Sequence, residues 1–297
     1  MPIPEAQLET WSRQGSITQS SLTYNMVKNV LEANDIPYAD KNYKVFLQGS
    51  YGNDTNIYRE SDVDIVIKLN DCFRYDLSGL SQAQQDAFYS THSGAATYTH
   101  AKFKSDVLNV LSDRYDSDVE SGEKAIVIAS NGNRRKADVI VAIQYRRYYR
   151  FVSTSNQSYE EGICFYASSG QEIANYPKLH SENLTKKHKS TSMWFKPMIR
   201  ILKNLRGRLI TEGMLENGVA PSYYLEGLLY NVPDDKFGKC YGDSFVNAIN
   251  WIQKANRAKF VCANGQYPLL RDGLPVTWRT DKCDAFLKAV IDLWTQW

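Results

Sequence analysis

Two aspartates separated by one residue stand at the start of an apolar stretch. Asp62 and Asp64 flank Val63, and Ile65 and Ile67 follow them in the sequence SDVDIVIK. On a β-strand, residues two apart share a face, so the carboxylates lie on one side while the aliphatic side chains pack on the other. Neighbouring carboxylates repel each other unless a cation lies between them, and Mg²⁺ or Mn²⁺ suits such hard oxygen ligands. The spacing therefore predicts a divalent-metal site on a half-buried strand.

A Gly-Ser pair precedes these acids in the stretch QGSYGNDTNIYRESDVDIVIK, which runs from Gln48 to Lys68. Glycine lets the backbone come close to a phosphate, while backbone N–H groups and a hydroxyl can donate to it. We therefore assign Gln48, Gly49 and Ser50 to a phosphate-binding turn. A D-x-D pair alone is usually a solvated turn or strand end. A G-S pair followed by D-x-D in an apolar strand, however, resembles the DNA polymerase β-like nucleotidyltransferase superfamily.

A third acid lies in a predicted β-hairpin at residues 125–144, whose turn is marked by Asn131-Gly132. Asp138 is the single acid in the apolar run ADVIVAI. Taken alone it is equally well a hydrogen-bonded aspartate at a strand edge. The superfamily has its third acid in this setting, so the resemblance implies that Asp62, Asp64 and Asp138 together hold two Mg²⁺ ions, which Mn²⁺ can replace. The basic residues 134–136 just before Asp138 are interpreted as a solvated turn.

The composition sets the broad class. The chain has 297 residues, of which 43% are hydrophobic and 23% charged, with a net charge of +2. This is a globular composition without a polyelectrolyte signal, so affinity for nucleotides must come from local groups. The five cysteines are scattered and include no C-x-x-C motif, which argues against a disulfide framework or zinc site and fits a reducing cytoplasm. No signal peptide or membrane-spanning run is expected.

Hydrophobic periodicity predicts several further elements. A long helix is expected from Ser16, with its apolar stripe at Leu22, Met26, Val27, Val30 and Leu31. Residues 70–100 show little periodicity beyond a short helix at 81–89, and we interpret them as an insertion or mobile flap. Further helices are expected at residues 101–115, 241–257 and 281–297.

The resemblance becomes more specific after the hairpin. The chain reads G-I-x-F from Gly162, then I-x-N-x-P and H-x-x-N, the last of these at His180 and Asn183. This arrangement is similar to the bacterial cGAS/DncV-like nucleotidyltransferases, or CD-NTases, and among them to clade E. The resemblance implies an α+β fold with a polymerase β-like core of mixed β-sheet and helices at residues 1–178. A helical C-terminal lobe at residues 179–297 would close the nucleotide pocket.

The helical lobe offers candidates for the nucleotide itself. Residues 185–208 carry many basic residues and no acid, in the pattern of an amphipathic helix with Pro197 in its first turn or at a kink. The resemblance places a lysine that binds the donor phosphates on this helix, which we assign to Lys203. It also places a Ser-Tyr pair later in the chain, here Ser222 near the phosphates and Tyr223 stacked on a base. The alternatives are a solvated basic face and a core tyrosine.

The resemblance implies synthesis of a cyclic dinucleotide or oligonucleotide from nucleoside triphosphates, here ATP and UTP. It also implies a role in anti-phage defence (CBASS), with the product acting on a separate effector. Several clade E enzymes use an asparagine to favour a pyrimidine, and Asn183 aligns with it, so we expect at least one uridine in the product; a helix cap is the other interpretation of Asn183. Activation by nucleic acid is not expected. The alternatives are a template-free enzyme with linear products, a nucleotidyltransferase that modifies tRNA or protein, and a catalytically silent nucleotide-binding module.

Overall fold

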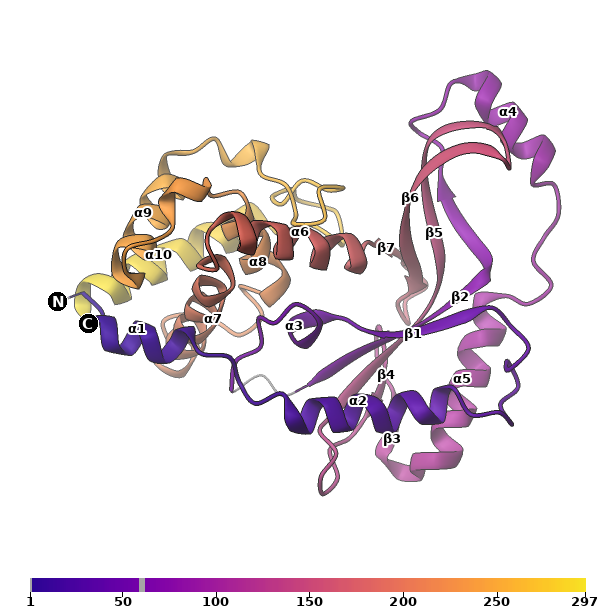
Figure 1. The fold of residues 1–297 in the computed structure, drawn as a ribbon, viewed down its shortest axis with the longest axis horizontal. Helices are drawn as coiled ribbons and strands as arrows, with labels where there is room; N and C mark the ends of the chain where they lie inside the picture. Colours follow the sequence, from indigo (N-terminus) through magenta and orange to yellow (C-terminus); the bar gives the residue numbers. More distant parts are fainter. Residues whose placement is uncertain (1, 59–61) are drawn as a thin grey trace. The chain divides into compact units, whose positions relative to one another are not determined.

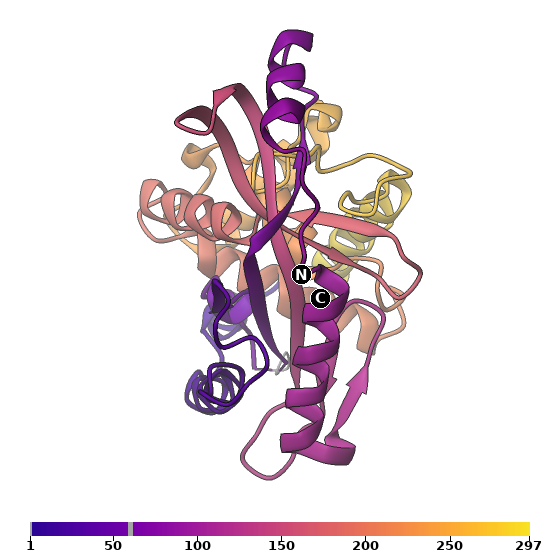
Figure 2. The ribbon, with the colours of Figure 1, turned by 90° about the vertical axis from the view of Figure 1, so that its right-hand side faces the viewer.

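The computed structural model describes residues 2–58 and 62–297, and the chain divides into two compact units. The sheet unit comprises residues 18–48 and 62–177, and the helical unit comprises residues 1–17, 49–61 and 178–297. Figure 1 labels the elements, and Figure 2 gives a second view of the ribbon. The units differ from the expected lobes 1–178 and 179–297, since two earlier segments group with the C-terminal helices. One reason is that the N-terminal helix α1 packs against α7 and α9 of the helical unit.

The described part of the sheet unit forms a seven-stranded mixed sheet. Its strands run in the order β1-β2-β5-β4-β3, and β6 pairs with both β5 and β7. The pairing of β2 with β5 is parallel and the other pairings are antiparallel. The strands are β1 Tyr43–Leu47, β2 Val63–Asp76, β3 Val119–Ser121, β4 Ile126–Ile128, β5 Ala137–Ser153, β6 Asn156–Tyr166 and β7 Glu172–Asn175. The strand after the D-x-D pair and the hairpin of β4 and β5 are thus confirmed.

Two helices cover one region of this sheet, α2 at Thr18–Leu31 and α5 at His100–Tyr115. The Thr99 hydroxyl caps α5 by accepting a hydrogen bond from the Lys102 N–H. Both helices were expected, but the apolar stripe predicted for α2 is partly wrong. Leu22 and Met26 are 52% and 43% exposed, while the smaller Ser20 and Thr23 are buried on the packed face.

The segment expected to be an insertion or mobile flap is largely packed structure. Strand β2 continues through residue 76, and helix α4 at Gln82–Thr91 then packs on β5. Phe88 of α4 is fully buried in an aromatic cluster with Tyr148 and Phe151. Within the sheet unit, α4 lies beside the tip of the β5–β6 hairpin, at the opposite end from β3 and β4 (Figures 1 and 2). The flap interpretation fails because aromatic anchors at irregular spacing leave no periodic signal.

The helical unit is organised around α7, whose apolar side is buried against α1, α8, α9 and α10. Its α-helices are α1 Glu5–Ser12, α3 Gly49–Gly52, α6 Pro177–Ser190, α7 Phe195–Thr211, α8 Ser222–Tyr230, α9 Tyr241–Lys254 and α10 Thr280–Gln296. Short 3₁₀ turns occupy Asp116–Asp118 in the sheet unit and Asp234–Lys236 and Arg257–Lys259 in the helical unit. No helix in the described ranges is long and apolar enough to cross a membrane.

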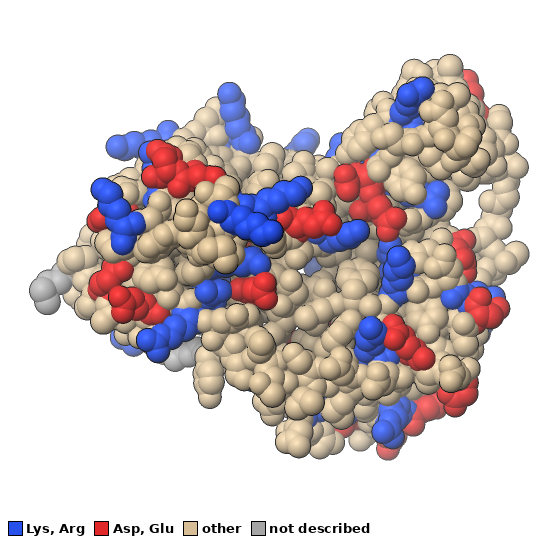
Figure 3. Space-filling view, in the orientation of Figure 1, with Lys and Arg blue, Asp and Glu red and all other residues tan. Residues whose placement is uncertain are grey.

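The expected basic helix at residues 185–208 is divided into α6 and α7. Between them Ser192 and Met193 have φ angles of 49° and 72°, a left-handed conformation that ends α6. Pro197 then lies in the first turn of α7, as expected, where its missing N–H costs no helical hydrogen bond. The face drawn in Figure 3 shows basic and acidic side chains intermixed, in keeping with the net charge of +2.

Candidate active site

The three aspartates meet on neighbouring parallel strands of the sheet unit. In the register of β2 and β5, Asp64 lies directly opposite Asp138, and Asp62 immediately precedes β2. Val63 and Ile65 are completely buried in the core, so the alternating acids Asp62 and Asp64 lie on the other face of the chain. The pairing therefore brings together the three acids that the sequence singled out.

A lysine lies between two of these carboxylates. Lys136 Nζ is 2.8 Å from Asp62 Oδ2 and 3.3 Å from Asp138 Oδ1. The hydrogen bond to Asp62 raises the pKa of the Lys136 ammonium, so this group stays positively charged. The interpretation of residues 134–136 as a solvated turn is wrong. Arg134 is buried and paired with Asp118, and the backbone N–H of Arg135 donates to Thr23 Oγ1.

The carboxylate set suits a divalent metal, although not in the side-chain arrangement seen here. Asp138 Oδ1 is buried and has no hydrogen-bond partner among the described residues, and the ammonium of Lys136 takes the place of a cation beside it. As the side chains lie, no three His, Cys, Asp or Glu residues within 2–58 and 62–297 form a ready metal cluster. Carboxylate oxygens are the ligands that Mg²⁺ prefers. The residues therefore fit Mg²⁺ once Lys136 moves aside.

The Gln48-Gly49-Ser50 turn begins where β1 ends. The backbone N–H of Gln48 donates to Asp64 O at 2.9 Å, and Gln48 Oε1 is buried without a partner in the described structure. Gly49 has a φ of +65°, a backbone conformation that glycine adopts readily and that other residues disfavour. From Gly49 on, the loop belongs to the helical unit. Asn53 N–H donates to Gly49 O at 3.0 Å and Thr55 N–H to Ser50 O at 2.9 Å, which closes the turn.

Lys203 of α7 is completely buried, and its ammonium lies 3.5 Å from Glu226 Oε1 and 3.4 Å from Thr55 Oγ1. The sequence predicted that this lysine contacts the donor phosphates. In the structure its charge is instead compensated by a buried carboxylate that the sequence analysis missed. The phosphate contact stays a prediction, and it requires the ammonium to exchange partners.

Ser222 and Tyr223 begin helix α8 directly after Pro221. The Ser222 hydroxyl accepts a hydrogen bond from Arg206 Nη1 at 3.1 Å. The Tyr223 ring stacks on His180 with centroids 4.9 Å apart, and its hydroxyl accepts from Asn264 Nδ2 at 2.9 Å. Burial raises the pKa of the Tyr223 phenol well above its usual value, so it stays neutral. Stacking of Tyr223 on a base remains a prediction.

Asn183 lies inside α6 rather than at its end. Its Nδ2 donates to the backbone carbonyl of Ala263 at 2.9 Å. The helix-cap interpretation is therefore wrong, because the side chain bridges to a distant loop of the same unit. An amide held in this way presents a fixed carbonyl and a second N–H, which are the groups needed to read a uracil edge.

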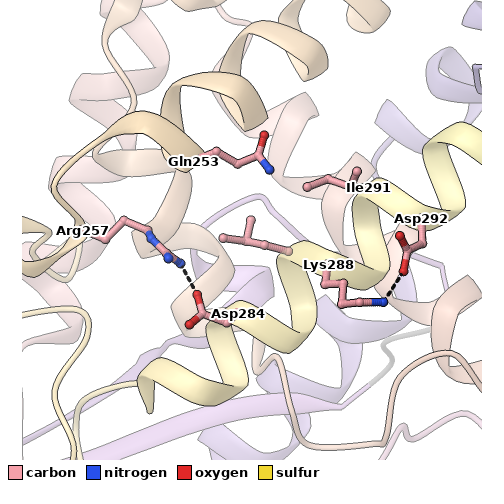
Figure 4. Close-up of a pocket in the computed structure, with 7 residues that line it drawn as sticks. Gln253, Arg257, Asp284, Lys288, Ile291 and Asp292 are labelled. Carbon is pink, nitrogen blue, oxygen red and sulfur yellow. Dashed lines mark hydrogen bonds and ion pairs between the residues drawn. The ribbon is translucent and has the colours of Figure 1, made fainter.

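A separate pocket of about 320 Å³ lies between α9 and α10 (Figure 4). Its charges are paired with one another, Arg257 with Asp284 and Lys288 with Asp292. Neutralised pairs leave little charge for a triphosphate, so this pocket is a weaker candidate than the carboxylate face.

Comparisons with known proteins identify the family. Residues 182–295 match the cGAS/DncV-like nucleotidyltransferase C-terminal helical domain. A cyclic UMP-AMP synthase from Rhodothermus marinus is 42% identical over 299 aligned residues, which cover 100% of this chain and 99% of the relative. The chain belongs to the CD-NTase family, clade E. It is a nucleotidyltransferase and a cyclic dinucleotide synthase, which confirms the class predicted from the sequence.

Two solved CD-NTase structures share the fold. The R. marinus CdnE c-UMP-AMP synthase, solved with Apcpp and Upnpp, has a TM-score of 0.89 and 41% identity, with 100% of this chain and 98% of that chain covered. The Elizabethkingia meningoseptica CdnE synthase, solved with GTP and Apcpp, has a TM-score of 0.78 and 30% identity, with 99% and 98% covered. The predicted α+β fold with a helical C-terminal domain is thereby confirmed.

Proposed function

We propose that this enzyme joins two nucleoside triphosphates, ATP and UTP, into a cyclic dinucleotide that contains at least one uridine. The observation that carries the proposal is the end-to-end similarity to the R. marinus cyclic UMP-AMP synthase. Other relatives at 35% identity are named as cyclic dipurine and cyclic dipyrimidine synthases, so base choice varies within the family. The position of Asn183 in α6, with its amide held by Ala263, supports a pyrimidine preference.

The three aspartates are proposed to hold two Mg²⁺ ions, which Mn²⁺ can replace. When bound, such a pair of ions activates an attacking hydroxyl and neutralises charge on the departing pyrophosphate. The opposed positions of Asp64 and Asp138 support this assignment, with Asp62 completing the set. Before metal enters, Lys136 must give up its contacts with Asp62 and Asp138. Its release would free Asp62 Oδ2, which now accepts a hydrogen bond from it, and would remove the ion pair with Asp138.

The remaining predicted residues are proposed to bind and orient the donor nucleotide. Gly49 and Ser50 would receive the phosphates on their backbone N–H groups, with Gln48 just before them, and Lys203 of α7 and Ser222 of α8 would add further contacts. Tyr223 would stack on a base, which typically contributes about 1–3 kcal/mol. In each transfer a ribose hydroxyl gives up its proton to water and its oxygen bonds to the α-phosphorus. The bond between the α-phosphorus and the oxygen that bridges to the β-phosphate breaks, and pyrophosphate leaves. A second transfer by the linear intermediate closes the ring.

We further propose that the product is a signal in anti-phage defence (CBASS), read by a separate effector, and that nucleic acid is not needed for activity. A cytoplasmic location is part of the same proposal. The five cysteines are free thiols in the structure, which supports a reducing compartment.

Mass spectrometry of the reaction product tests the proposed chemistry. The purified protein is incubated with the four nucleoside triphosphates and Mg²⁺ or Mn²⁺, then treated with phosphatase. We expect a phosphatase-resistant cyclic dinucleotide containing uridine. A cyclic product of purines alone would refute the base assignment. Linear products, or a nucleotide attached to RNA or protein, would refute cyclisation and favour the other transferase classes.

A further inference from the structure

A buried carboxylate joins four polar side chains of the helical unit. Glu226 on α8 is 3% exposed. Its Oε1 accepts a hydrogen bond from the Thr55 hydroxyl and lies 3.5 Å from Lys203 Nζ. Its Oε2 accepts from Asn53 Nδ2 at 3.3 Å and lies 2.7 Å from His180 Nε2. Glu226 is thus the common partner of α6, α7 and the loop after Gly49-Ser50.

A carboxylate at this depth persists only when its partners offset the cost of desolvation. Burial pushes the pKa of Glu226 upward, but the charge of Lys203 and the contacts with His180 and Thr55 outweigh it, and the pKa falls to about 2. The side chain is therefore ionised under all ordinary conditions. It acts as a fixed acceptor for the groups around it.

The two loop residues that bind Glu226 are also the two that close the Gly49-Ser50 turn. The Asn53 side chain donates to Glu226, and its backbone N–H donates to Gly49 O at 3.0 Å. The Thr55 hydroxyl donates to Glu226, and its backbone N–H donates to Ser50 O at 2.9 Å. Each connection from the carboxylate to the turn consequently passes through a single residue. Movement of the carboxylate would loosen both closing hydrogen bonds.

We propose that Glu226 is a positioning residue that holds the Gly49-Ser50 turn in its phosphate-binding shape. The inference rests on the proposed function, in which this turn receives the donor triphosphate. The same helix starts with Ser222 and Tyr223, so one element carries the anchor of the turn and two further predicted nucleotide contacts. The turn would then be ordered before the nucleotide arrives, which lowers the entropic cost of binding.

Two variants and a control test this role. Glu226→Gln removes the charge. Thr55→Val removes the connection from the hydroxyl to Glu226 and the contact of Lys203 with that hydroxyl, but it leaves the Lys203–Glu226 pair in place. Ser244→Ala serves as the control, because this buried hydroxyl of α9 bonds, among the described residues, only to Gly238 and makes no contact with the turn. Amide hydrogen exchange at residues 53 and 55 is measured in the nucleotide-free protein. Binding of a non-hydrolysable ATP analogue is measured by calorimetry, and kcat and KM are measured for triphosphates.

In both variants we expect exchange at amides 53 and 55 to accelerate, and affinity for the analogue to fall, by about tenfold, the effect of losing one hydrogen bond to a charged group. KM should rise more than kcat falls. Ser244→Ala should leave the exchange rates, the affinity for the analogue, KM and kcat unchanged. If Glu226→Gln does not fold, Thr55→Val alone decides. Faster exchange with unchanged analogue affinity would refute the positioning role. If the wild-type protein binds the analogue but forms no cyclic product, the proposed function is contradicted. The positioning role of Glu226 is still supported in that case, provided that the two variants weaken binding of the analogue.

Discussion

Replacement of Lys136 by methionine is expected to strengthen divalent-metal binding by the nucleotide-free enzyme about fivefold. Lys136 is the counter-ion of Asp62 and Asp138, and these are proposed metal ligands. A metal that binds them must displace the ammonium, because like charges at that distance repel each other. Methionine keeps an unbranched side chain that is one atom shorter, and it removes the ammonium together with its charge and its hydrogen bond to Asp62.

The magnitude follows from the two contacts of Lys136. They measure 2.8 and 3.3 Å, but the side chains are 40% exposed for Lys136, 48% for Asp62 and 28% for Asp138, so water screens them. Exposed ion pairs contribute about 0.2–1 kcal/mol each, and two together about 1 kcal/mol. The metal-free variant should lose a similar amount of unfolding free energy, since its carboxylates then repel each other without compensation. In saturating metal this loss should disappear.

Titration with Mn²⁺, followed by the electron paramagnetic resonance signal of the free ion, measures the affinity. Urea unfolding with and without Mg²⁺ measures the stability. Lys124→Met is the matched control, because it removes an exposed lysine of the sheet unit in the turn between β3 and β4. Unchanged or weaker Mn²⁺ binding by Lys136→Met would show that this lysine does not compete with metal.

Three further outcomes are expected. Gly49→Ala should lose about 1 kcal/mol of unfolding free energy and bind triphosphate more weakly, because Gly49 has a φ of +65°. Gly213→Ala is the control, since Gly213 has a φ of +71° with open space around it. This control should lose similar stability without an effect on binding. Asn183→Ser should lower the uridine content of the product, measured by mass spectrometry, and an unchanged product would count against base reading by this residue. Burial, with the charge of Lys196, lowers the pKa of His188 from 6.5 to about 4, so unfolding free energy should fall as pH drops through that interval. His188→Gln should flatten this dependence in urea titrations, and an unaltered slope would contradict the assignment.

The sequence was sufficient to predict the strands that carry the acids. Period-two alternation around Asp64 and Asp138 marks half-buried strands, and the structure confirms that they are neighbours. The same pattern could not reveal their register or the parallel direction, because these depend on partners distant in the chain. Lys136 was missed for a related reason. A basic tripeptide before a strand looks like a solvated turn until the fold brings Asp62 to it.

Glu226 could have been found by the reasoning applied to Asp138. It is the one acid in the apolar helix SYYLEGLLY, and a lone acid among aliphatic residues needs a partner. Its connection to Asn53 and Thr55 could not be predicted, because the loop at residues 49–58 leaves the sheet unit for the helical one. The burial of Lys203 was hidden by the many basic residues around it. Local sequence does not distinguish a buried lysine from its solvated neighbours.

Asp62, Asp64 and Asp138 are proposed to drive nucleotidyl transfer. The most direct test compares the rate of cyclic dinucleotide formation, with Mg²⁺ at saturation, in wild type, Asp64→Asn and Asp138→Asn. Asp71→Asn is the control, because Asp71 is an exposed acid of the same strand β2. We predict that the rate falls about a hundredfold or more in Asp64→Asn and in Asp138→Asn, because each variant removes a preorganised charge that would stabilise the transition state. The control should keep the wild-type rate. Wild-type rates in Asp64→Asn or Asp138→Asn would show that these carboxylates are not needed for nucleotidyl transfer.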